Sequence, residues 1–146
     1  MKLKDFIVCD DIRAEINNKF SLMGIYNDAL NLTVQEKLAD NWPKIVHLGF
    51  YIRLDIESLE ELKSIGKFVL ESAQNGEINF RAERIFNEII KENHPLRQMI
   101  ISVVFDQIKI ISLGEMELSL SVYNKKDELI TRFIYPGNIK VSVTAL

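Results

Sequence analysis

Apolar and polar residues alternate over residues 6–26, where two strand-like runs flank Asn17 and Asn18. Asparagine tolerates positive φ better than other non-glycine residues do, and a two-residue hairpin turn needs positive φ at both central positions. We therefore predict a β-hairpin in which Ile16 faces Lys19. Because side chains alternate along a strand, this register places six residues on one face, which we expect to turn toward the core: Phe6, Val8, Asp10, Ile12, Met23 and Ile25.

Asp10 is the one carboxylate on this predicted inner face. A buried carboxylate is costly unless it is hydrogen-bonded or paired. The opposite face of the same strand carries Asp11, Arg13 and Glu15. A register slip of one residue, or a bulge, would exchange the two faces.

The same period of two recurs along the chain and is clearest over residues 45–55. Its apolar members are Val46, Leu48, Phe50, Ile52 and Leu54, as expected for a strand with one buried face. We predict further strands at 29–34, 65–73, 115–123, 129–135 and 139–145, and two short strands within 99–113 that are separated near Asp106 and Gln107. Residues 35–41 are expected to form a helical turn, and 57–63 a loop or short helix.

Residues 78–93 fit two patterns. Ile78, Phe80 and Ala82 alternate as in a strand returning from the turn signal at Asn75 and Gly76. A stripe at helical spacing also fits, formed by Ala82, Ile85, Phe86, Ile89 and Ile90. We favour a strand from Ile78 and a helical turn or two over 84–92, closed by Pro95. The stripe would cover one open end of the fold or, alternatively, dock on a partner.

Short strands separated by polar turns, with little helix, indicate an all-β fold with minor α content. We predict a single domain over 1–146, an antiparallel two-sheet β-sandwich of about eight or nine strands with one short helix; a barrel is the alternative.

Composition narrows the class of protein. Of the 146 residues, 47% are apolar and 27% are charged, which is typical of a folded globular domain. The net charge is −3 and the 18 lysines and arginines are spread along the chain, which argues against nucleic-acid binding. The single cysteine, Cys9, excludes an internal disulfide and fits a reducing compartment. The charged N-terminus predicts neither a signal peptide nor a membrane span, so we expect a cytoplasmic protein.

Four charged residues gather on the first strand, and we take them as candidate binding residues: Asp10, Asp11, Arg13 and Glu15. Asp10 and Asp11 point to opposite faces and would not share a metal ion unless the strand were bulged. One interpretation is a polar site. We favour a structural one, in which Asp10 anchors a loop through backbone N–H groups and Arg13 pairs with its acidic neighbours.

Signatures of catalysis and cofactor binding are absent from the sequence. The two histidines, His47 and His94, lack the short spacing of a metal site. A Cys9 nucleophile with His47 as base and Asp10 or Asp11 as its orienting group lacks a supporting motif, and we expect Cys9 to pack as a small apolar residue. Aromatic residues could line a sugar- or peptide-binding face but fit packing better: Tyr26, Trp42, Tyr51 and Tyr123. We predict no catalytic residue, metal or cofactor.

The hairpin motif resembles one found in a bacterial family of small β-sandwich proteins, a domain of unknown function. Members begin with C-D-D-x-R-x-E, then a turn, then K-x-S-L-x-G-x-Y. Here Cys9 to Glu15 and Lys19 to Tyr26 match that pattern. The resemblance covers about the first thirty positions, and it implies a sandwich fold without implying an activity.

These observations favour a non-enzymatic binding or protein-interaction module that contacts a partner through a sheet edge or loops. Unpaired edges also favour self-association, which would give a homo-oligomer. The alternative is a small-molecule or divalent-ion binding domain, or a weak hydrolase, that uses Asp10, Asp11 and Glu15.

Overall fold

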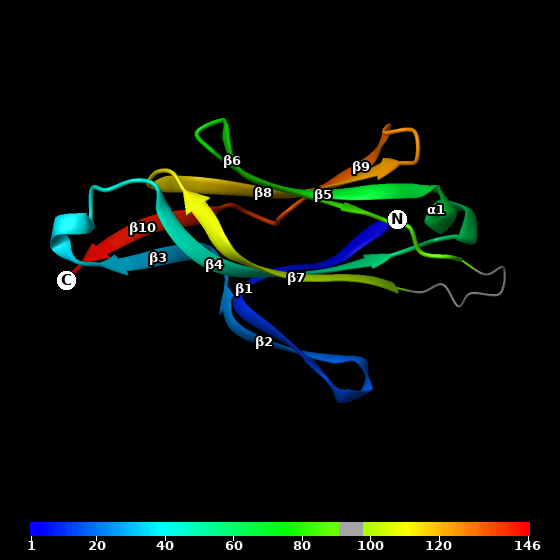
Figure 1. The fold of residues 1–146 in the computed structure, drawn as a ribbon, viewed down its shortest axis with the longest axis horizontal. Coiled ribbons are helices and arrows are strands. Elements are labelled where there is room, and N and C mark those ends of the chain that lie inside the picture. The colour runs from blue at the N-terminus through cyan, green and yellow to red at the C-terminus, as the bar shows by residue number, and fades with distance from the viewer. Residues whose placement is uncertain (91–97) are drawn as a thin grey trace.

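Two β-sheets pack face to face in the computed structural model, which describes residues 1–90 and 98–146 (Figure 1). The four-stranded sheet has the order β2-β1-β4-β7, with β1 (Lys2–Glu15), β2 (Lys19–Tyr26), β4 (Lys44–Asp55) and β7 (Gln98–Ile110). The six-stranded sheet has the order β3-β10-β8-β5-β6, and β9 also pairs with β8. Its strands are β3 (Ala29–Val34), β5 (Ile65–Gln74), β6 (Glu77–Ile85), β8 (Gly114–Asn124), β9 (Leu129–Ile134) and β10 (Ile139–Ala145).

The predicted sandwich is confirmed, and so is the inward face of its most regular strand. Leu48, Phe50, Ile52 and Leu54 of β4 are buried, and the alternate apolar residues of β8 meet them from the other sheet: Met116, Leu118, Leu120 and Val122. Each such side chain contributes about 1.5–3 kcal/mol through burial. The described residues hold ten strands, and the β3–β10 pair is parallel whereas the others are antiparallel.

One short helix, α1 (Leu59–Ser64), closes an end of the sandwich. Ser58 is its N-cap, because the Ser58 hydroxyl accepts a hydrogen bond from the Glu61 backbone N–H at 3.1 Å. The Glu61 carboxylate in turn lies 2.8 Å from the N-terminal ammonium of Met1. A one-turn 3₁₀ segment, Glu36–Leu38, takes the place predicted for a helical turn. None of the helices in the described part of the chain is long and apolar enough to cross a membrane.

The helix predicted over 84–92 is wrong for the described residues. Strand β6 continues to Ile85, and residues 86–90 have no regular structure; 91–92 and Pro95 lie outside the described residues. The physical reason is pairing with β5, which brings Arg84 opposite Phe68 and Ile85 opposite Lys67. At Arg84 and Ile85, backbone hydrogen bonds to the neighbouring strand outweigh the helical spacing of the apolar stripe.

Residues 98–110 form one strand rather than the predicted two. The β4–β7 register shifts between Val46 and Leu48, whose partners are Ile108 and Phe105. His47 is therefore opposed by two residues of β7, which is the arrangement of a β-bulge. The polar pair expected to break the strand bends it instead.

The hairpin is present, but its predicted register is wrong by one residue. Glu15, not Ile16, faces Lys19, so the turn has three residues, and Asn17 and Asn18 have φ of 62° and 56°. As a result Met23 and Ile25 lie opposite Asp11 and Cys9. They do not share a face with Phe6 and Val8, which are buried as predicted.

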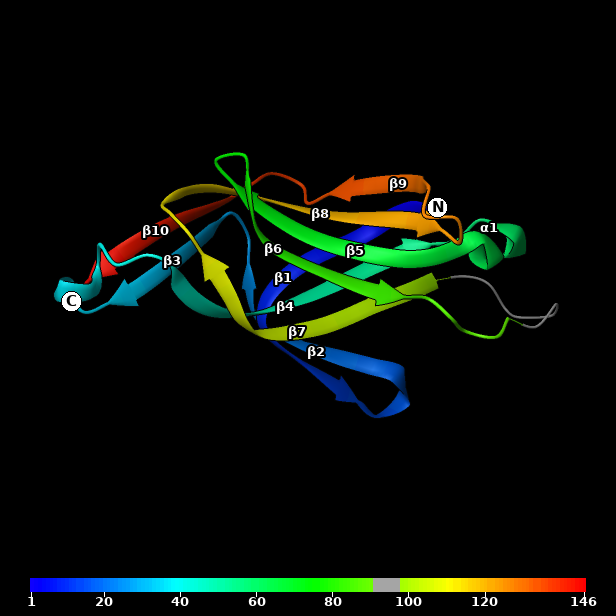
Figure 2. The same cartoon turned by 45° about the horizontal axis from the view of Figure 1, so that its top comes forward.

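Pairing of β1 with β4 ends where Cys9 meets Gly49. Beyond this point residues 10–25, which we call the hairpin arm, leave the sheet and project from its outer side, with the turn pointing away from the sheet (Figures 1 and 2). The Phe20 ring lies edge-to-face on Tyr51, with centroids 5.6 Å apart. Asp10 is exposed at the base of the arm, so its predicted inward position is wrong: the sandwich core ends before the strand reaches it.

Candidate functional site

The four predicted binding residues all lie on the hairpin arm, and the three acidic ones have local hydrogen-bond partners. Asp10 is exposed and accepts a short hydrogen bond from the Tyr26 hydroxyl. Asp11 Oδ1 accepts from the backbone N–H of the next residue at 2.9 Å, and Glu15 Oε1 accepts from the Ser21 hydroxyl at 2.9 Å. Arg13 is exposed and forms no ion pair with any described residue, so its predicted pairing with acidic neighbours is wrong within the described residues. The donor to Asp10 is a side-chain hydroxyl and not the predicted backbone N–H groups. These side chains do not converge on one point.

His47 connects the arm to the β7 bulge. Its Nδ1 atom lies 2.9 Å from Asp106 Oδ1, and its Nε2 atom lies 3.9 Å from Asp11 Oδ1. Within residues 1–90 and 98–146, histidine, cysteine and acidic side chains form no cluster of three or more suited to a metal ion. His94 lies outside the described residues.

Cys9 is fully buried, and its thiol lies 3.4 Å and 3.7 Å from the backbone oxygens of Asp11 and Gly49. Burial, followed by the charge of Asp10, raises the pKa of the Cys9 thiol. A nucleophilic cysteine needs a lowered pKa and an accessible sulfur. The environment of Cys9 is therefore that of a structural residue.

The four aromatic residues considered for a binding face each have a different partner. The Lys44 ammonium lies 4.7 Å from the Trp42 ring, and the Lys67 ammonium lies 5.2 Å from that of Tyr123. Tyr51 contacts the Phe20 ring of the arm, and the Tyr26 hydroxyl donates a hydrogen bond to Asp10. They provide separate packing contacts instead of a common platform.

One side of the sandwich is open between β6 and β7, the last strands of their sheets (Figure 2). At one end the two edges are tied together, because the Asn79 side chain donates a hydrogen bond to the Lys109 carbonyl at 2.8 Å. Next to this tie, the Phe80 and Phe105 rings pack edge-to-face with centroids 4.7 Å apart. Each of these two strands keeps one edge outside the sheet ladders.

Beyond the phenylalanine pair the sheets enclose a cavity of about 200 Å³, which we call the β6–β7 slot. A cavity of about 130 Å³ adjoins it and shares three of its lining residues, Phe68, Arg84 and Ile101. Two charged residues, Glu83 and Arg84, line the slot. Its other walls are apolar side chains from both sheets: Ile52, Phe68, Leu70, Ala82, Ile101, Val103, Phe105 and Leu120. The slot thus reaches the hydrophobic core, whose residues Ile52 and Leu120 form its inner wall and stay buried.

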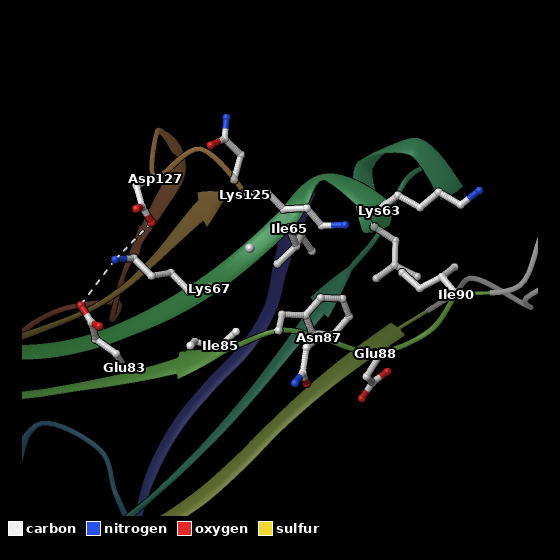
Figure 3. Close-up of a pocket in the computed structure, with 14 residues that line it drawn as sticks. Lys63, Ile65, Lys67, Glu83, Ile85, Asn87, Glu88, Ile90, Lys125 and Asp127 are labelled. Carbon is white, nitrogen blue, oxygen red and sulfur yellow. Dashed lines mark ion pairs between the residues drawn. The ribbon is translucent and has the colours of Figure 1, made fainter.

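A wider hollow of about 520 Å³ lies at the α1 end of the sandwich (Figure 3). Lys67 crosses its rim and pairs with Glu83 at 3.6 Å and with Asp127 at 3.5 Å. Three lysines and three acidic residues line this hollow, so their formal charges cancel. This balance gives the hollow no preference for a charged ligand.

Neither a protein-family model nor a curated protein sequence matches this chain. The resemblance of the hairpin motif to a bacterial family stays a prediction.

The residues that line the β6–β7 slot were not among the predicted site residues. One sequence signal marks them: among the alternate residues Phe80, Ala82 and Arg84, the first two are apolar and the third is charged. That signal becomes visible only when 78–85 is assigned as a strand.

Proposed function

We propose that this protein is a non-catalytic binding module that takes up an apolar group of its ligand in the β6–β7 slot. The observation that carries the proposal is the slot itself, an apolar cavity of about 200 Å³ that opens between two edge strands. Ligand sites are concave and mostly apolar with a few polar groups, and the slot has this composition.

The free edges of β6 and β7 favour a ligand that is an extended peptide. Edge strands offer unpaired N–H and C=O groups, with which an added strand forms main-chain hydrogen bonds. Its alternate side chains would then point into the slot. This is the sheet-edge interaction with a protein partner that the sequence predicts, and a second copy of the chain would provide such a strand as well.

The location of the protein is proposed on separate grounds. Cys9 is buried as a free thiol, which supports a reducing compartment such as the cytoplasm. The hairpin motif supports a bacterial origin.

The role of the slot in binding is tested by a substitution that fills the cavity with a larger side chain. Ala82 lies in the wall of the slot, so Ala82→Phe occupies the cavity; Ala29→Phe places the same side chain at an exposed position on β3 and serves as the matched control. Random extended peptides selected by display on the wild-type protein are then measured by fluorescence anisotropy on all three proteins. We expect alternating apolar residues in the selected peptides, full affinity for Ala29→Phe, and at least a tenfold loss for Ala82→Phe.

Melting curves confirm that Ala82→Phe is folded, and Ala82→Leu replaces it if it is not. A folded slot-filled variant that binds the selected peptides as tightly as the wild type would overturn the proposal.

A further inference from the structure

Arg84 occupies an inward-facing position on an edge strand. In the β5–β6 ladder Ala82 pairs with Leu70, and Arg84 pairs with Phe68. Leu70 and Phe68 are buried, so their partners on the same face of the sheet are directed toward the space between the sheets. Consistent with this, Arg84 lines both the β6–β7 slot and the adjoining cavity of about 130 Å³.

The neighbouring charges do not neutralise Arg84. Glu83 also lines the slot, but its carboxylate is paired with other cations, since it lies 2.6 Å from Arg81 and 3.6 Å from Lys67. Glu88 lines the adjoining cavity but forms no ion pair with Arg84. Within the described residues, Arg84 has no ion pair within 4 Å. Arg84 is exposed, so its guanidinium is a solvent-accessible positive charge beside the apolar slot, with donors available to a ligand.

We propose that the ligand of the slot is an apolar group that bears a carboxylate, held by the Arg84 guanidinium. This inference rests on the proposed function and names the chemistry of the ligand. A guanidinium binds a carboxylate through two parallel charge-assisted hydrogen bonds, which adds orientation as well as affinity. An apolar cavity of roughly 150 Å³ holds benzene, so a slot of about 200 Å³ accepts a phenyl ring or a branched aliphatic group.

Two sources supply this chemistry. One is the last residue of a peptide chain, whose side chain enters the slot while the terminal carboxylate meets Arg84; the free strand edges favour this source. The other is a free aromatic or aliphatic acid. The alternative role for Arg84, which the test below distinguishes, is protection against aggregation. An inward-pointing charge on an edge strand discourages edge-to-edge association.

The test compares acids with their neutral amides. The probes are 3-phenylpropionate, 3-phenylpropionamide, and a pentapeptide of alternating threonine and valine that ends in phenylalanine, with a free or an amidated terminus. Titration calorimetry and amide chemical shifts follow binding to the wild type, to Arg84→Gln and to Arg84→Lys. Arg13→Gln is the matched control, since Arg13 is exposed on the arm and forms no ion pair with a described residue.

We expect the acid forms to bind the wild type at least tenfold more tightly than the amides. Arg84→Gln should remove this preference, Arg84→Lys should retain part of it, and Arg13→Gln should leave it unchanged. Added salt should weaken the binding of the acids and leave the binding of the amides unchanged. Tighter binding of the peptide acid identifies a chain terminus as the ligand, and tighter binding of phenylpropionate identifies a small acid.

If acids and amides bind the wild type equally, the role of Arg84 is overturned while the slot remains a binding site. If Arg84→Gln keeps the preference for acids but self-associates, the arginine is protective and the inference is wrong. The proposed function fails as well if no probe shifts the amide resonances of slot residues and the selected peptides bind Ala82→Phe as tightly as the wild type.

Discussion

Ile12 lies directly above Gly49 on the outer surface of the four-stranded sheet. A Cβ atom added to Gly49 would come within 3.0 Å of Ile12 Cγ1 and 3.1 Å of Cys9 Sγ. Such distances are shorter than normal van der Waals contact, so the absence of a side chain at Gly49 lets the hairpin arm lie against the sheet.

Gly49→Ala should therefore destabilise the protein by about 1–3 kcal/mol, as overpacking does. Urea denaturation measures the change. In an Ile12→Ala background, Gly49→Ala should lower the free energy of unfolding by clearly less, because the side chain that it would crowd has been removed. Equal costs in both backgrounds would show that the arm does not rest on Gly49.

Gln74 should contribute to the stability of the fold although it is a buried polar residue. Its side chain is 1% exposed, donates to the Ser112 carbonyl at 2.8 Å and accepts from the Ile111 N–H at 2.8 Å. Gln74→Leu leaves both backbone groups without these partners and should cost about 1–3 kcal/mol. Gln35→Leu, at an exposed position, is the control and should change the denaturation midpoint little. A stable Gln74→Leu protein would contradict this account.

Tyr26 should ionise late in an alkaline titration. Burial, the hydrogen bond to Asp10 and the charge of Asp10 raise the pKa of Tyr26 from 10.0 to about 12. The folded state thus holds this proton more tightly than the unfolded chain does, so the stabilisation is complete below pH 10 and is lost as the pH approaches 12. Ultraviolet phenolate absorbance should show a component near pH 12 that Tyr26→Phe removes. An unchanged profile in that variant would refute the assignment.

Divalent cations should not stabilise the protein through the acidic residues of the arm. Asp10, Asp11 and Glu15 bond to different local partners instead of facing one point. A ligand that binds only the native state raises the melting temperature with its concentration. Thermal melts with calcium, magnesium, manganese and zinc should show no such rise. A rise that disappears in Asp11→Ala would restore the alternative hypothesis of an ion-binding arm.

Local patterns in the sequence predicted much of the fold. The alternation in β4 and β8 predicted their buried faces, because the period of side chains along a strand is a property of the strand alone. Asn75 and Gly76, with φ of 52° and 75°, likewise form the predicted turn. Where a helical and a strand pattern overlapped, pairing with β5 decided the outcome up to Ile85.

The candidate site was less predictable. The charged cluster of the first strand was visible in the sequence, yet the arm separates its members from the core and from one another. The slot is formed by residues from both sheets, such as Phe68 and Val103, which no local pattern brings together. Arg84 was visible only as a charge inside an ambiguous segment.

The sequence by itself determined which residues form strands, which of their faces are apolar and where most turns lie. Apart from the pairs that a hairpin turn joins, the tertiary structure alone decided which strands pair. It set the hairpin register, made β10 run parallel to β3, from Lys140 beside Ala29 to Ala145 beside Val34, and left β6 and β7 as neighbouring free edges. The physical reason is that alternation fixes the two faces of a strand, whereas its neighbours are chosen by contacts between residues far apart in the chain.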